Sequence, residues 1–375
     1  MYIKELELSN FRNYEELKVS FSEGVNIFLG ENAQGKTNLL EGIYLHAMAR
    51  SFKTQRDRDL IRFGQDYCQV KAVSHYEEEE HTSEIIISRE GAKAVRVDGA
   101  KIERTSELLD RLHIIIFSPE DLKIVKDEPG KRRAFMDREI CQLRPMYVSL
   151  LNDYRRILKQ RNAYLRENIM DEVVLSVWDS ELIRLGARLS RERRRFIEKI
   201  DKIANEIHHR ISGGRENLTL SYETDLDTEA YNAKAGQSLQ VNNEEECFAQ
   251  LLTESNEKDR LYGTTRKGPH HDDIKISADG IDLRRFGSQG QQRTAALSLK
   301  LSEIKLIEEE TGDSPILLLD DVLSELDSDR QKYLINSLGD NQMFITTTDL
   351  IGSVARELPE GKIFTIKNGE IDIEI

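Results

Sequence analysis

Residues 25–37 of the chain read VNIFLGENAQGKT. The first five residues form an apolar run that predicts a buried strand, and the pattern G-x-x-x-x-G-K-T follows at once, before a stretch of helical character. Glycines in such a loop let backbone N–H groups surround phosphates, and the start of the helix adds partial positive charge. The predicted phosphate-binding loop consists of Gly30, Glu31, Asn32, Ala33, Gln34, Gly35, Lys36 and Thr37. Lys36 is expected to reach the β- and γ-phosphates of ATP, and Thr37 to coordinate Mg²⁺.

A second motif, ILLLDD at residues 316–321, is an apolar strand that ends in two carboxylates. The first carboxylate of this pattern helps to hold Mg²⁺ in ATPases that have such a loop, so Asp320 is predicted to lie near Thr37. Asp321 occupies the position where related ATPases usually have a glutamate that polarises the attacking water. We expect Asp321 and Lys36 to be catalytic, and hydrolysis to be slow because aspartate is one methylene shorter than glutamate.

A third motif, FGSQGQQR at residues 286–293, precedes an apolar helical stretch. It resembles the L-S-G-G-Q signature of ABC-type ATPases, with Gln289 in place of a glycine. Ser288, Gly290 and Gln291 would form a helix N-terminus suited to a γ-phosphate, but one too distant to serve the loop of its own subunit. The motif therefore predicts a homodimer around ATP, in which Ser288 completes the catalytic site of the opposing subunit.

Residues 345–349, ITTTD, occupy the place of the switch segment in such ATPases, but its usual histidine is absent. Thr347 or Thr348 would contact the γ-phosphate instead, or either could simply cap a strand. The sequence does not decide between these alternatives.

The chain has 375 residues, and its 54 Lys and Arg against 68 Asp and Glu give a net charge of −14. This length predicts two or three domains. The three cysteines are odd in number and far apart, which argues against a disulfide framework or a zinc site. No apolar run approaches the roughly 18 residues of a membrane span, and the first residues lack a signal-peptide pattern. We expect a cytoplasmic protein without membrane contact.

The middle of the chain is basic despite the acidic total. Residues 131–215 contain 20 Lys and Arg against 12 Asp and Glu. Apolar residues that recur every seven positions predict an amphipathic helix over 180–211, which ends before Gly213 and Gly214. The candidate DNA contacts are Lys131, Arg132, Arg133, Arg191, Arg193, Arg194 and Arg195. These charges could also be ordinary solvated faces, and the sequence pattern alone leaves both interpretations open.

Six short segments in order give the chain a specific resemblance. They are NFRNY at 10–14, the loop at 30–37, FSPEDL at 117–122, KRRAFMD at 131–137, GPHHDD at 268–273 and GSQGQQR at 287–293. Together they resemble the bacterial RecF family over the whole chain. About 250 residues separate the phosphate loop from the signature-like motif, which is more than in transporter subunits and far fewer than in SMC proteins.

The resemblance implies an α/β fold: an ABC/SMC-like P-loop ATPase head with an inserted helical second lobe and no long coiled coil. It also implies ATP-dependent dimerisation on double-stranded or gapped DNA, and work with RecR and RecO to load RecA in recombinational repair. Any ATPase activity would be a weak, DNA-stimulated switch. By the same resemblance, Arg12 and Asn13 lie near the nucleotide.

The expected organisation places residues 1–117 and 267–375 in the ATPase lobe and residues 118–266 in the basic helical lobe. The motif at 287–293 would then lie at the lobe boundary. Two alternatives remain at this point: a nucleotide-binding subunit of another ABC-type system, which would need a membrane partner, and a structural SMC-like head, which would need a long coiled coil.

Overall fold

The computed structural model describes residues 1–109, 111–167, 171–235, 240–348 and 361–374. The chain divides into two compact units, one made of residues 1–123 and 296–375 and the other of residues 124–295. Residues 267–295, which the sequence analysis assigns to the ATPase lobe, cluster with the second unit instead. The reason is strand pairing: β10 (Asp273–Ala278) lies antiparallel to β9 (Leu218–Glu223) along its whole length.

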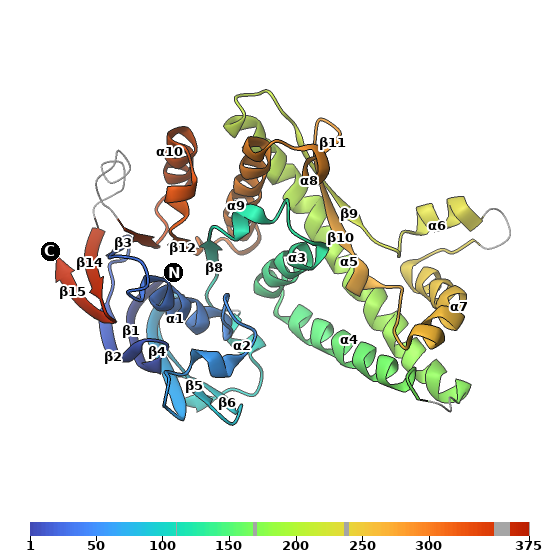
Figure 1. Cartoon of the computed structure of the whole chain (residues 1–375), viewed down its shortest axis with the longest axis horizontal. Helices are drawn as coiled ribbons and strands as arrows, with labels where there is room; N and C mark the ends of the chain where they lie inside the picture. The colour runs from blue at the N-terminus through green and yellow to red at the C-terminus, as the bar shows by residue number, and fades with distance from the viewer. Residues whose placement is uncertain (110, 168–170, 236–239, 349–360, 375) are drawn as a thin grey trace. The chain divides into compact units, whose positions relative to one another are not determined.

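The predicted strand at residues 25–29 lies inside a six-stranded sheet of the first unit (Figure 1). Its strand order is β15-β14-β3-β13-β12-β8, and all neighbours are parallel except the β14–β15 hairpin. The strands are β3 (Val25–Leu29), β8 (Ile114–Phe117), β12 (Ile316–Asp320), β13 (Met343–Thr347), β14 (Gly361–Lys367) and β15 (Glu370–Glu374). Since parallel strands are covered on both faces, β12 and β8 consist of continuous apolar runs.

A second sheet of the first unit is antiparallel, with the order β2-β1-β4-β5-β6-β7. Its strands are β1 (Tyr2–Phe11), β2 (Tyr14–Ser20), β4 (Tyr67–Tyr76), β5 (Glu79–Ser88), β6 (Lys93–Val97) and β7 (Ala100–Lys101). Helix α1 (Lys36–Met48) contacts strands of both sheets and is buried along almost its entire length. A helix held between two sheets has no polar face to present, which explains why its sequence lacks an amphipathic pattern.

Short helices and one long helix complete the first unit. The short elements are α2 (Ser106–Leu109), α10 (Ser328–Ser337) and the 3-10 turns η1 (Asp57–Leu60), η2 (Asp121–Lys123) and η5 (Val322–Glu325). The long helix α9 (Gln289–Thr311) begins in the second unit and continues into the first from Ala296. The signature-like motif thus stands at the start of a helix that crosses the boundary along the chain.

The second unit is mainly helical, with α3 (Pro129–Leu143), α4 (Pro145–Tyr164), α5 (Glu172–Ile211) and α7 (Glu244–Tyr262). Helix α5 packs against α4, α7 and β9. It begins eight residues before the predicted helix because Asp171 caps its first turn, where its carboxylate accepts a bond from the N–H of Val173 at 2.8 Å. With 40 residues it extends about 60 Å, and the described ranges contain no longer helix and no extended coiled coil.

The rest of the second unit consists of α6 (Thr228–Ala235), η4 (Pro269–His271), β11 (Ile281–Asp282) and α8 (Leu283–Phe286). Among the described residues, no helix combines the length and the apolar character that crossing a membrane requires.

Candidate functional site

A cavity of about 270 Å³ lies in the first unit at the carboxyl end of β12. Ligands of open α/β sheets bind at this edge. The lining consists of Glu31, Asn32, Ala33, Gly35, Lys36, Thr37, Asn38, Lys53, Asp320, Asp321 and Thr346. The structure therefore brings together the predicted loop and the predicted carboxylates, which are about 280 residues apart in the sequence.

The loop is held from its outer side, where bonds to Gln34 fix its path. The C-terminal hairpin donates from the N–H of Gly369 to the Gln34 carbonyl at 3.1 Å and from the N–H of Asn368 to its side-chain oxygen at 2.7 Å. Gly30 approaches β14 so closely that an added Cβ would lie 2.4 Å from the carbonyl oxygen of Ile366. The first turn of α1 leaves its N–H groups without helical partners, and these N–H groups begin at the loop. This arrangement is a phosphate cradle.

Asp320 joins the two halves of the site. Its Oδ1 accepts hydrogen bonds from the Thr37 hydroxyl at 2.8 Å and from the Thr346 hydroxyl at 3.0 Å. Burial raises the pKa of Asp320, while these two bonds and the charge of Lys53 act in the opposite direction. The N–H of Asp321 donates to the Thr346 hydroxyl at 2.9 Å, which holds the backbone of Asp321 beside the site.

The Lys36 ammonium lies over its own loop, where it donates to the carbonyl oxygen of Glu31 at 3.0 Å and to that of Gly30. Burial lowers the pKa of Lys36, and the nearby charges of Asp321 and Asp320 oppose this shift. Two carbonyl groups are weak substitutes for phosphate oxygens. The lysine is thus positioned at the loop with its charge available to an anionic ligand.

Arg12 and Asn13 support the cavity but do not line it. The guanidinium of Arg12 forms a bidentate pair with the fully buried Glu41 of α1, at 2.7 and 2.8 Å, and also donates to the carbonyl oxygen of Asp59. The Asn13 amide donates to the carbonyl oxygen of Gln34 at 3.1 Å. Both residues therefore act through α1 and the loop, one layer away from where a nucleotide would bind.

Three lining residues were not predicted from the sequence: Lys53, Asn38 and Thr346. Thr346 lies opposite Asp320 in the parallel pairing of β13 with β12, whereas the sequence pattern named its neighbours Thr347 and Thr348 and left their role open. The register of the two strands decides this, and one sequence cannot reveal it. Lys53 follows α1 in an irregular segment without a motif. Burial lowers its pKa, against the charges of Glu41 and Asp320.

The signature-like residues form a capped helix start. The Ser288 hydroxyl accepts a bond from the N–H of Gln291 at 3.2 Å, and the Gln291 side chain accepts one from the N–H of Ser288 at 2.9 Å. This is a capping box. The Gln291 amide also donates to Glu216 at 2.9 Å, while Ser288 and Gly290 are exposed. None of the three lines the cavity described above.

Two of the seven predicted DNA contacts are buried, so the structure contradicts that role for them. Arg132 is 2% exposed and donates two hydrogen bonds to the carboxylate of Asp273, at 2.6 and 2.9 Å. Arg193 is also 2% exposed and bonds Asp137 and Asp272, which are themselves buried. Charges enclosed in this way cannot exchange their partners for DNA phosphates. The prediction failed because it grouped neighbours in the sequence, although adjacent residues point about 100° apart around a helix.

The other five predicted contacts reach the surface to different degrees. Lys131 is exposed, and Arg133 is half-buried with a bond to the carbonyl oxygen of Asp272 at 2.7 Å. On α5, Arg194 lies over the ring of Tyr222, while Arg191 and Arg195 form surface ion pairs with Glu244 and Glu192. The three α5 arginines remain available to a ligand, since surface pairs of this kind contribute little stability.

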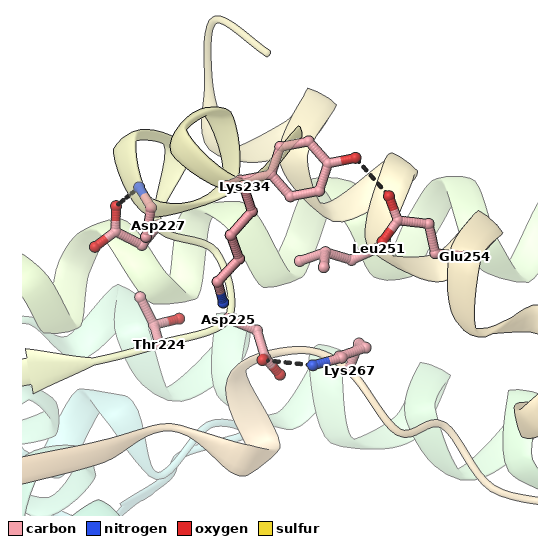
Figure 2. A pocket seen from close by; sticks show the side chains of 9 residues that line it. Thr224, Asp225, Asp227, Lys234, Leu251, Glu254 and Lys267 are labelled. Carbon is pink, nitrogen blue, oxygen red and sulfur yellow. Dashed lines mark hydrogen bonds and ion pairs between the residues drawn. The ribbon is translucent and has the colours of Figure 1, made fainter. Parts of the chain in front are cut away.

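The second unit contains a separate cavity of about 410 Å³ between α6, α7 and the segment after β9 (Figure 2). Lys267 pairs with Asp225 at 2.8 Å, and the hydroxyl of Tyr231 donates to Glu254 at 2.6 Å. Figure 2 shows Lys234 extending into this space. Its two lysines face three carboxylates, so it lacks the excess of donors that an anion requires. The cavity at the loop, with its N–H groups and Lys36, suits an anion better than this one.

The parallel sheet, the phosphate cradle and the carboxylate after β12 define a P-loop protein of the ABC and SMC ATPase-head class. The RecF/RecN/SMC N terminal domain family matches residues 2–353. The chain belongs to the RecF family. It is 42% identical to the DNA replication and repair protein RecF of Agathobacter rectalis, over 100% of this chain and 99% of the relative. The RecF protein of Geobacillus thermodenitrificans is 43% identical, over 99% of each chain.

Solved structures agree with this assignment. The recombination mediator protein RecF-ATP in RecFOR pathway superposes with a TM-score of 0.89 at 38% identity, covering 100% of this chain and 98% of that one. An SMC head bound to the C-winged helix domain of ScpA gives a TM-score of 0.55 at 18% identity, covering 100% and 97%. The second similarity shows the shared fold alone. The predicted fold class is confirmed.

Proposed function

We propose that the chain is an ATP-dependent DNA-binding protein of recombinational repair and replication-fork maintenance. It dimerises on ATP at gapped or double-stranded DNA and, together with RecR and RecO, helps to load RecA. The observation that carries the proposal is the bond between Thr37 and Asp320 in a cavity that also holds Lys36. The relatives named for DNA replication and repair, and the similar structure named for RecF-ATP and the RecFOR pathway, support it.

The donor groups in the cavity fit Mg²⁺ and ATP. A hydroxyl and a carboxylate oxygen, from Thr37 and Asp320, are the hard ligands that Mg²⁺ accepts, and their contact distance of 2.8 Å shows that they converge on one point. When bound, Mg²⁺ would neutralise charge on the β- and γ-phosphates. Lys36 and the N–H groups at the start of α1 would hold the phosphate oxygens, and Asp321 would orient the water.

Hydrolysis in this proposal is a slow switch. Asp321 lines the cavity but has one methylene fewer than glutamate with which to reach a water beyond the γ-phosphate. The ATP-bound state would therefore persist, and with it any contact that the γ-phosphate makes to a second subunit.

The second subunit would contribute Ser288 and the exposed start of α9 beside it. The first turn of α9 carries no acidic residue, so its partial positive charge is available to a phosphate. Because the capping box already fixes Ser288 and Gln291, this surface needs no rearrangement of its own before it meets the γ-phosphate of a partner.

The proposal is tested by substitution at Ser288. Ser288→Arg should permit ATP binding by monomers and abolish ATP-induced dimers in sedimentation velocity experiments. Ser288→Asp should do the same while preserving the helix cap, because aspartate is a good N-cap residue whose charge repels a γ-phosphate. Thr253→Arg, on the exposed face of α7, is the control and should dimerise as the wild type does. Dimers of either Ser288 variant with ATP would show that this segment is an ordinary helix cap.

The DNA-binding part of the proposal rests on the basic second unit. With Arg132 and Arg193 removed from the candidates, Lys131, Arg133, Arg191, Arg194 and Arg195 remain. These five do not form one surface, since they lie on two helices and on different faces of α5.

A further inference from the structure

Helix α5 carries a straight row of cations on its outward face. They are Arg184, Arg188, Arg191, Arg195, Lys199 and Lys202. The successive spacings of four, three, four, four and three residues follow the turn of an α-helix, so all six side chains leave the same face. Glu192 and Glu198 lie along the two edges of this face.

The opposite face of α5 fixes this orientation. Leu182, Leu189, Phe196 and Ile203 are at most 6% exposed and pack into the core of the unit. Arg193 lies in the middle of that buried face, which is why it is the one arginine of its cluster that is enclosed. The row of six cations faces away from this core, and its members are exposed or half-exposed.

The ion pairs along the row are weak and exchangeable. Arg184 pairs with Glu181, Arg191 with Glu244 and Arg195 with Glu192, and the three arginine side chains keep exposures of 58%, 41% and 61%. Exposed pairs of this kind are worth only ~0.2–1 kcal/mol each. Among the described residues, Arg188 and Lys202 form no ion pair. A polyanion would therefore displace little stabilising energy when it binds along α5.

The row has the dimensions of a segment of duplex. The distance along the helix from Arg184 to Lys202, eighteen residues further on, is about 27 Å, which equals about eight base pairs of B-form DNA at ~3.4 Å per pair. The row is rigid because it lies on one continuous helix that is packed along its length. It also offers no aromatic side chain on which unpaired bases could stack, which is the usual device of proteins that bind single strands.

We propose that this face of α5 receives the sugar-phosphate backbone of duplex DNA and reads no base. The inference rests on the proposed function, since it presupposes that the chain binds DNA, and it names the surface and the form of DNA. The row takes the place of the arginine cluster at residues 191–195 as the expected contact surface. Of that cluster, only Arg191 and Arg195 belong to the row.

The test compares two triple variants that remove the same charge from the same unit. The row variant combines Arg188→Gln, Arg195→Gln and Lys202→Gln. Glutamine has a helix propensity close to those of arginine and lysine. The control combines Arg156→Gln, Lys159→Gln and Lys258→Gln, at exposed positions of α4 and α7. Binding of a fluorescent 30-base-pair duplex is titrated with ATP at several salt concentrations, and a single strand of equal length is measured in parallel.

In the row variant, the plot of log K against log salt should become less steep by about 2.7 per subunit. Its affinity for the duplex at 0.15 M salt should fall about 100-fold. The control should stay near the wild type, and the duplex should bind more tightly than the single strand. An unchanged slope in the row variant, while the wild type binds, would overturn this surface and leave the proposed function standing. Equal binding of both DNA forms would overturn the duplex assignment. If the wild type binds no DNA with ATP, both proposals fail.

Discussion

Replacement of the buried Arg193 by methionine should destabilise the second unit strongly. Its guanidinium bonds Asp137 at 2.9 Å, Asp272 at 3.0 Å and the carbonyl oxygen of Pro269 at 2.7 Å. Both aspartates are at most 4% exposed. Arg193→Met would leave two buried carboxylates without their shared cation, and breaking a buried pair from one side costs about 3–5 kcal/mol.

The matched control is Arg195→Met, two positions along the same helix. Arg195 has a 61% exposed side chain and one surface pair with Glu192, so its loss should change the free energy of unfolding by less than about 1 kcal/mol. Trp178 is the only tryptophan and lies on α5, so its fluorescence during urea denaturation reports on this unit. With a slope of about 2 kcal/mol per molar urea, the Arg193→Met midpoint should fall by about 2 M.

The destabilisation should also depend on pH. Burial already raises the pKa of Asp272, and the charge of Arg193 opposes this shift, so the pKa rises further when the arginine is removed. A carboxyl group whose pKa is raised in the folded state costs stability increasingly as pH rises above its unfolded-state pKa, and the cost is complete once pH exceeds the folded-state pKa. The deficit of Arg193→Met should therefore be larger at pH 8 than at pH 5. A midpoint within 0.5 M of the wild type at both pH values would refute the reasoning.

Two further predictions concern the nucleotide site. Lys36→Ala should abolish productive ATP binding, whereas Asp320→Asn should retain some binding but block turnover, because the cradle and the Mg²⁺ ligands have separate tasks. Equilibrium binding of a fluorescent ATP analogue measures the first effect, and phosphate release measures the second. Unchanged activity in either variant would contradict the assignment. Asp321→Glu should accelerate single-turnover hydrolysis, since the longer side chain extends further toward the water, and a slower rate would remove Asp321 from that role.

The sequence was sufficient to predict those parts of the site that depend on residues close together in the chain. The loop at residues 30–37 and the carboxylate at the end of β12 require particular residue types at fixed spacing, and both were located. Thr346 was not, because its role depends on the register of β13 against β12. Lys53 reaches the cavity from a segment without periodicity, so only the folded chain reveals it.

The basic residues show the same limit in another form. Charge counting located the second unit, yet four neighbouring arginine positions at 191–195 were treated as one patch, although the turn of the helix directs them to different sides. The seven-residue repeat of apolar residues already placed the buried face of α5, and the position of Arg193 could have been read from it. The partners of Arg132 and Arg193 could not, since Asp273 and Asp272 lie far along the chain.

The position of β3 within its sheet has a consequence for synthesis of the protein. This strand precedes the phosphate loop, but its two sheet neighbours, β13 and β14, come after the whole second unit in the sequence. The hairpin of β14 and β15 also supplies the bonds that hold Gln34. A chain that lacks these strands therefore has the loop motif without the strands and hydrogen bonds that position it. The phosphate loop therefore reaches its folded position only after β13, β14 and β15 have been synthesised.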